Sequence, residues 1–418
     1  MRGSANISCA LREATASLHP SLSQGGMIMN ERQQMKKQRL ISVAAVIALA
    51  AGSAVAVAPA SNAAGTVKIA FQGPLTGPEA QTGTDEVRGV ELALELYNAK
   101  NPTTKVELVK VDDQGDPAIA GTVAPGVAKD ASIVALVGAA YSGATIASLP
   151  SYKASPALPM ISPSATRPSL TDPKSPDFGQ PVFHRIVSND ALQGPALVRV
   201  ATKGVAKPAV YVVDDQSSYA TGLRDVVIPT IGDQGIKWLV GQDSVVKGTT
   251  DFSAVIAKIK KVKANVVIYT GYYADGAKFA KQLRDKGYKG VLAGGDGVLN
   301  SAFIKLAGKK AAEGYRFTAP TTPLDIASPK LTAAFKKKFG ADPGVYSTEA
   351  FDATNMFLEA ISKGNTTRDT ILSYIKKMKF KNTAGVTISF NANGDLNGAG
   401  LINAFVVKNG KIVLTGVA

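Results

Sequence analysis

The sequence has almost none of the residues that build metal centres, redox pairs and disulfide frameworks. Its 418 residues contain one cysteine, Cys9, and two histidines, His19 and His184. Zinc sites and thiol redox sites draw mainly on these residue types, and a disulfide needs two cysteines. We therefore expect no bound metal, no disulfide and no other cofactor.

Aromatic residues and basic clusters are also scarce. Only 6% of the residues are aromatic, and although Lys and Arg number 47 against 32 Asp and Glu, they form no dense block. Nucleic-acid-binding proteins concentrate their basic residues in a patch or stripe. We therefore expect no nucleic-acid partner, despite the formal net charge of +15.

The rest of the composition is that of a globular protein. Apolar residues make up 45% of the chain and charged residues 19%, which is enough to build a large core. At ~150 residues per domain, this length predicts two or three domains, or two lobes that share strands.

Residues 35–63 predict a secretion signal. A basic start at 35–39 precedes an uncharged apolar run over 40–57, and small residues stand at Ser61 and Ala63. This order is typical of a leader, which we expect to be cleaved after Ala63. A retained membrane anchor is less favoured, because the run is short for the ~20 residues of a span. No cysteine stands at the cleavage point, so we expect a protein exported to the periplasm, cell surface or medium without a lipid anchor.

The chain after the leader alternates strand-like and helix-like segments. Short β-branched runs predict strands, and apolar positions three to four residues apart predict helices. The first half predicts strands at 67–71, 106–111, 133–137, 158–161 and 182–187. The second half predicts strands at 209–213, 237–240, 266–270, 291–293, 386–390 and 401–407. Helices are expected between these strands and at 331–339, 346–362 and 370–378. Such alternation specifies an α/β fold, with parallel sheets covered by helices on both faces.

The segment 138–143 follows a predicted strand and opens a helix. As a phosphate loop it lacks the Lys-Ser/Thr ending that contacts nucleotides. As a nucleophile elbow around Ser142 it has alanine in place of both glycines, and its base would be His184 or a lysine. We favour an anion site for a carboxylate, formed by backbone N–H groups at the helix start near Ser142 and Thr145. A plain helix cap by Ser142 is the alternative.

An acidic residue also follows a predicted strand. Asp296 stands between glycines directly after the strand at 291–293, and the carboxyl ends of strands line the ligand crevice of a doubly wound sheet. Tyr219 and Tyr272 follow two other strands and are candidates for the pocket wall. The alternatives are a turn role for Asp296 and a core role for the two tyrosines.

Together these motifs resemble a known family. In chain order they are Gly73-Pro-Leu-Thr-Gly-Pro78 with Gly83, Asp112-Asp-Gln-Gly-Asp-Pro117, Met160-Ile-Ser-Pro-Ser-Ala-Thr166, Asp251-Phe-Ser253, Tyr269-Thr-Gly-Tyr272, Gly295-Asp-Gly297, and Tyr346 with Phe351-Asp-Ala353. From about Val67 to Gly416, the sequence resembles the leucine/isoleucine/valine-type periplasmic binding proteins, which are solute receptors of branched-chain amino acid ABC transporters.

The resemblance implies a type I periplasmic-binding-protein fold, with two doubly wound α/β lobes joined by three crossings. Lobe 1 would comprise residues 66–187 plus 320–395, and lobe 2 residues 188–319 plus 396–418. Residues 1–63 would be a non-core extension and secretion signal. The implied protein is a non-enzymatic monomer whose partners are a small amino acid and a membrane ABC permease.

The resemblance also implies roles for single residues. The ligand carboxylate would be held by Ser142, Ser164 and Thr166. The ligand ammonium would be held by Asp296 and Tyr272. The pocket wall would be formed by Thr82, Tyr141, Tyr219 and Tyr346.

Three features depart from the family pattern. Gram-negative members carry a disulfide beside the carboxylate site, where this chain has Gly115 and Tyr141. Asp296 is one methylene shorter than glutamate, and Thr82 is small where an aromatic residue often stands. These departures bear on the preferred ligand side chain more than on the grip on an α-amino acid.

We therefore expect an exported receptor that delivers a small aliphatic amino acid to an ABC permease. One alternative is the same fold tuned to an amide, urea or an aromatic acid, although Asp296 would repel a purely anionic ligand. Another is a secreted serine hydrolase that uses Ser142. A sensory ligand-binding domain would need a membrane helix after the second lobe, and we expect none, since the sequence ends at Ala418.

Overall fold

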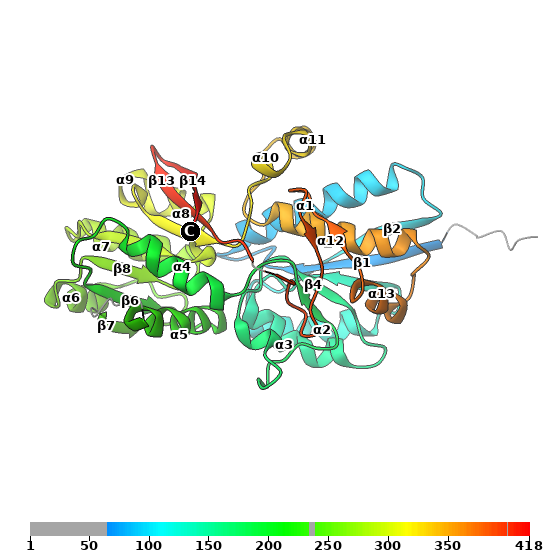
Figure 1. Cartoon of the computed structure of the whole chain (residues 1–418), viewed down its shortest axis with the longest axis horizontal. Coiled ribbons are helices and arrows are strands. Elements are labelled where there is room, and N and C mark those ends of the chain that lie inside the picture. Colours follow the sequence, from blue (N-terminus) through cyan, green and yellow to red (C-terminus); the bar gives the residue numbers. More distant parts are fainter. Residues whose placement is uncertain (1–64, 234–238, 399) are drawn as a thin grey trace, which may run out of the picture. The chain divides into compact units, whose positions relative to one another are not determined.

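The computed structural model describes residues 65–233, 239–398 and 400–418, all within one compact unit (Figure 1). The predicted secretion signal lies outside the described residues. Among the described residues, we find no helix with both the length and the apolar character of a membrane span.

The first sheet has five parallel strands in the order β2-β1-β3-β4-β5. Its strands are β1 (Gly65–Gly73), β2 (Thr104–Asp112), β3 (Ile133–Val137), β4 (Met160–Ser162) and β5 (Phe183–Arg185). Between them run α1 (Ala80–Asn98), α2 (Pro117–Lys129), α3 (Ser142–Lys153) and the 3₁₀ turn η1 (Pro168–Thr171). The apolar side chains of β1 and β3 are buried, as expected for a sheet covered on both faces.

The second sheet has seven strands in the order β14-β13-β10-β9-β8-β6-β7. The parallel strands are β6 (Val210–Asp214), β7 (Leu239–Ser244), β8 (Val266–Tyr269), β9 (Val291–Gly294) and β10 (Arg316–Ala319). The antiparallel edge consists of β13 (Asn403–Lys408) and β14 (Lys411–Val417). The accompanying helices are α4 (Asp190–Thr202), α5 (Ser218–Asp233), α6 (Ser253–Lys261), α7 (Tyr273–Asp285), η2 (Asp296–Val298), α8 (Ser301–Ala307) and α9 (Lys309–Ala312).

A third stretch of chain returns from the second sheet to the first. It carries α10 (Leu324–Ala327), α11 (Pro329–Phe339), α12 (Ser347–Ser362), α13 (Arg368–Ile375) and the two-residue strands β11 (Phe380–Lys381) and β12 (Thr387–Ile388). Helix α12 packs along α1, and both α12 and α13 contact β3 (Figure 1). The chain thus crosses between the sheets after β5, after β10 and before β13, which confirms the predicted fold class.

A buried arginine ties two of these crossings together. Arg185, at the end of β5, has a fully buried side chain whose Nε donates to Asp395 Oδ1 at 2.5 Å. Its Nη1 donates to the carbonyl oxygens of Ala165 and Arg167. A buried guanidinium needs such partners, because its charge cannot be removed at ordinary pH. The chain before β13 is therefore fixed against the end of β5.

The sequence predictions were wrong at several of the later strands. The expected strand at 386–390 is reduced to β12, and β10 and β14 were not predicted. Strand β10 is only four residues long, and β14 is an edge strand with alternating exposure, so neither has a long apolar run. The predicted strand at 237–240 starts at Leu239, since residues 234–238 lie outside the described residues.

Two glycines allow close packing around α1. A Cβ added at Gly83 would lie 2.0 Å from the carbonyl oxygen of Pro74, and one at Gly89 would lie 2.3 Å from that of Ser347. The first approach lets the loop after β1 fold over the start of the helix. That loop leads to Thr82 and therefore helps to place the functional site.

We predict that Gly83→Ala lowers the free energy of unfolding by about 1–3 kcal/mol, because the new methyl group must displace the loop backbone. The matched control is Gly126→Ala in α2, where an added Cβ would meet no atom within 4 Å. It should raise the free energy of unfolding by roughly 0.5–1 kcal/mol through helix propensity. Urea unfolding measures both, and equal responses would contradict this packing.

Candidate functional site

The loops that follow strands of both sheets meet around one small cavity. Its volume is about 20 Å³, which is room for roughly one water molecule. Eight of the nine residues predicted for the site line it: Thr82, Tyr141, Ser142, Ser164, Tyr219, Tyr272, Asp296 and Tyr346. Parallel strands deliver their carboxyl-end loops to one edge of a sheet, which explains why residues so distant in sequence converge.

Asp296 is the acidic centre of this cavity. Its side chain is buried, with 6% exposed. Oδ1 accepts hydrogen bonds from Tyr219 Oη at 2.8 Å and Gln193 Nε2 at 2.5 Å, and Oδ2 accepts one from Tyr346 Oη at 2.8 Å. All three donors are uncharged, so the carboxylate has hydrogen bonds but no cation.

Burial raises the pKa of Asp296, although its three hydrogen bonds act in the opposite direction. A second acid, Asp190 at the start of α4, has its pKa raised well above the usual range, first by burial and then by the charge of Asp296. One Asp190 oxygen accepts from Thr166 Oγ1 at 3.1 Å, and Oδ1 is buried without a hydrogen-bond partner in the structure. Burial therefore disfavours the charged form of both acids, and a cation placed beside them would stabilise that form.

Tyr346 connects Asp296 to the helices of the first sheet. It directly precedes α12 and belongs to the apolar core around β1 and β3. Its φ of +62° lies in the left-handed region, which bulky residues rarely adopt. Such a backbone persists where the surroundings demand it, and here it accompanies the hydrogen bond to Asp296.

The opposite side of the cavity is formed by the start of α3. Ser142 is the first residue of this helix, and no side chain caps it, so the alternative of a helix cap by Ser142 is wrong. Its Oγ accepts from the backbone N–H of Arg167 at 3.3 Å. Ser164 Oγ donates to the carbonyl oxygen of Ala140 at 2.8 Å. An uncapped helix start beside two hydroxyls is a suitable place for a carboxylate.

Thr166 is the one predicted residue that does not line the cavity. It is fully buried, and its hydroxyl donates to Asp190. Its carbonyl oxygen accepts from the Asp190 backbone N–H at 2.9 Å. In this structure Thr166 therefore supports the neighbouring acid.

Aromatic rings form the wall between the two sheets. Tyr141 and Tyr272 stack with ring centroids 4.1 Å apart and planes 6° from parallel, and Tyr219 lies 5.1 Å from Tyr272. Lys247 Nζ lies 5.3 Å from the Tyr272 ring centroid and donates to the carbonyl oxygen of Gly115 at 3.0 Å. The two sides of the cavity are thus in direct contact.

Sequence reasoning missed several residues that hold the site closed. Glu79 accepts from Tyr141 Oη and from the Ala274 backbone N–H, both at 3.3 Å, and burial raises its pKa to about 8. Gln193 lies in the middle of α4, where no local motif marks it. Glu79 follows a Gly-Pro pair that indicates only a turn.

The geometry does not supply the base of a serine hydrolase. His184 Nδ1 lies 3.1 Å from the carbonyl oxygen of Val182, and burial lowers the pKa of this imidazole to about 4. The ring packs 4.8 Å from that of Phe390. Within the described residues, the Ser142 hydroxyl has no hydrogen bond to His184 or to a lysine.

Comparison with known proteins agrees with this architecture. The model of a family described as periplasmic binding protein matches residues 66–410. A leucine-, isoleucine-, valine-, threonine- and alanine-binding protein of Pseudomonas aeruginosa is 31% identical over 368 residues, covering 87% of this chain and 95% of its own. The Leu/Ile/Val-binding protein of Escherichia coli K12 is 30% identical, covering 79% and 88%.

Similar solved structures belong to the same kind of protein. A leucine binding protein from Thermotoga maritima has a TM-score of 0.74 and 27% identity, covering 84% of this chain and 98% of its own. A branched-chain amino acid transporter substrate binding protein from Streptococcus pneumoniae, in complex with isoleucine, has a TM-score of 0.75 and 27% identity, covering 84% and 99%. The resemblance found in the sequence is confirmed, and this chain belongs to the periplasmic binding protein family.

Proposed function

We propose that this protein captures a small aliphatic amino acid between its two lobes, without chemical change, and delivers it to a membrane ABC permease. The observation that carries the proposal is the single cavity lined by both the Asp296 carboxylate and the uncapped start of α3. An α-amino acid zwitterion carries a positive ammonium, which suits the Asp296 carboxylate, and a negative carboxylate, which suits the start of α3. The names of the relatives support the ligand class.

The two charged groups of the ligand would engage different lobes. Its carboxylate would meet the α3 backbone, Ser142 and Ser164, and Thr166 would join them after its hydroxyl turns away from Asp190. Its ammonium would replace the uncharged donors at Asp296, beside Tyr272. A charge-assisted hydrogen bond is roughly twice as strong as a neutral one, so the ammonium is the better partner for a buried carboxylate. Only the closed form offers both contacts, so ligand binding favours closure.

We further propose where the lobes and the leader begin and end. Lobe 1 comprises residues 66–187 plus 320–395, and lobe 2 residues 188–319 plus 396–418. Residues 1–63 are removed on export by cleavage near Ala63, without lipidation, and the secreted protein acts as a monomer. The three passages between the sheets support these boundaries.

A purely anionic ligand fits this cavity less well. Asp296 and Asp190 lie together, and the nearby cation Arg185 is bound to Asp395 and to carbonyl oxygens. An aromatic acid without an ammonium would bring a further carboxylate to a region that already holds two buried acidic side chains. The electrostatics therefore favour a ligand that carries a positive group.

The ligand class is tested by a thermal-shift screen of the secreted protein against the twenty amino acids and against amides, urea and aromatic acids. A ligand that binds only the native state raises the melting temperature. At a free concentration one hundred times its dissociation constant, the ligand adds about 2.7 kcal/mol to the free energy of unfolding. We expect the largest shifts from leucine, isoleucine, valine or alanine. Shifts confined to amides, urea or aromatic acids would contradict the proposed ligand.

We predict that Asp296→Asn weakens binding of the best amino acid by about a hundredfold to a few thousandfold. The change leaves a buried ammonium without a counter-charge, which typically costs ~3–5 kcal/mol. Without ligand the melting temperature should stay close to that of the wild type, because burial already disfavours the charged form of Asp296.

Calorimetric titration and melting curves measure both quantities. The control is Asp285→Asn, which removes an exposed carboxylate paired only with Lys281 and should bind normally. If Asp296→Asn binds within fivefold of the wild type but melts much earlier, Asp296 has a structural role and the assigned ammonium site is wrong.

A further inference from the structure

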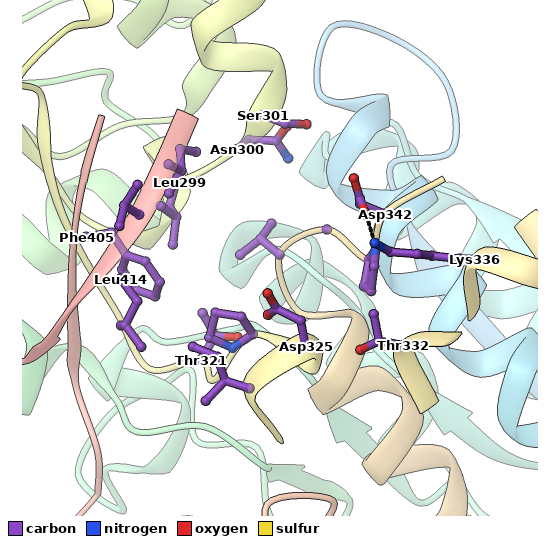
Figure 2. Close-up of a pocket in the computed structure, with 17 residues that line it drawn as sticks. Leu299, Asn300, Ser301, Thr321, Asp325, Thr332, Lys336, Asp342, Phe405 and Leu414 are labelled. Carbon is purple, nitrogen blue, oxygen red and sulfur yellow. Dashed lines mark ion pairs between the residues drawn. The ribbon is translucent and has the colours of Figure 1, made fainter. Parts of the chain in front are cut away.

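A second, much larger cavity borders the small one. Its volume is about 490 Å³, and it lies between the β13–β14 hairpin and the chain around α10 and α11 (Figure 2). Figure 2 shows Phe405 and Leu414 on the hairpin side, and Thr321 and Asp325 facing them from the returning chain. Val345 lines both cavities, so its side chain is part of the wall between them.

A hydrogen bond between a residue of the large cavity and a residue of the small cavity also belongs to this wall. Asn300, which lines the large cavity, donates from Nδ2 to Thr82 Oγ1 of the small cavity at 3.4 Å. Its Oδ1 accepts from the Ala302 backbone N–H at 2.9 Å and so caps α8. The wall between the two cavities therefore includes Val345 and this long hydrogen bond.

The small cavity must enlarge to hold any amino acid, because about 20 Å³ holds only a water molecule. The side chains that line it are buried, apart from that of Val345. Val345 is half-buried and packs against the apolar cores of both lobes. The large cavity behind it provides empty space into which a ligand side chain can displace it.

The large cavity suits apolar groups near this wall. Apolar side chains are contributed by Leu299, Phe405 and Leu414. On the other side of the cavity, Lys336 Nζ forms an ion pair with Asp342 Oδ1 at 2.6 Å. Figure 2 shows this ion pair apart from the three apolar residues. A neutral, extended side chain could therefore occupy the apolar part without breaking the ion pair.

We propose that Val345 is the specificity-determining residue for ligand side-chain length, and that the cavity behind it is a latent compartment for long apolar side chains. This inference rests on the proposed amino-acid function. In the wild type, Val345 and the Asn300–Thr82 hydrogen bond limit the ligand to short aliphatic side chains. A gap in this wall joins the two cavities and admits methionine or phenylalanine.

The test compares dissociation constants of valine, methionine and phenylalanine by calorimetry. Val345→Ala should improve the affinity for methionine and phenylalanine at least tenfold relative to the affinity for valine. This is the change expected from burying about two further methylene groups. Asn300→Ser retains a side chain that can cap α8 but removes the bond to Thr82, and should shift the preference in the same direction. Val413→Ala is the matched control, because Val413 lines only the large cavity, and it should leave the preference unchanged.

Melting curves establish that each variant is folded before binding is measured. Folded Val345→Ala or Asn300→Ser protein that keeps the wild-type order of affinities would overturn the inference. An equal shift in Val413→Ala would do so too, because the effect would then not depend on the wall. Wild-type protein that binds no amino acid would instead refute the proposed function, so the two failures are distinguishable.

Discussion

A buried carboxylate that receives hydrogen bonds from both lobes is the constraint on which the rest of the structure depends. Asp296 follows β9 of the second sheet, and Tyr346, which donates to it, belongs to the core of the first. Removing a carboxylate from water is costly unless it is paired or fully hydrogen-bonded. In the structure, Asp296 accepts hydrogen bonds from two hydroxyl groups and one amide group, all of them uncharged. A charged donor would form a stronger hydrogen bond with this carboxylate.

The fold turns this local preference into a conformational change. The loops at the carboxyl ends of the parallel strands of both sheets meet around one cavity, so under the proposed function each lobe would present half of a zwitterion site. The crossings hold the lobes together at one side, where Arg185 fixes the chain near Asp395. The stack of Tyr141 on Tyr272 closes the cleft elsewhere. Under the proposed function, a ligand that completes both halves would stabilise the closed arrangement by its differential affinity for that form, and a permease would recognise closure as occupancy.

Residues in the loops and helix starts that follow strands could be predicted from the sequence. Asp296, Ser142 and Tyr219 come after short β-branched runs, and parallel pairing brings such positions to one edge whatever their distance in sequence. Gln193 and Val345 could not be predicted in this way. Gln193 lies within α4, 103 residues from its partner Asp296, and Val345 lies in a loop whose neighbours depend on how α12 packs. Only tertiary packing places these side chains, so no local pattern indicates them.

The central claim is that ligand binding and lobe closure are one event. Small-angle X-ray scattering of the secreted protein, with and without a saturating amino acid, tests it most directly. We predict that the radius of gyration decreases on binding, because the ligand draws the two lobes together. An unchanged radius of gyration at proven occupancy would contradict the account, because Asp296 and the start of α3 would then hold the ligand without bringing the lobes together.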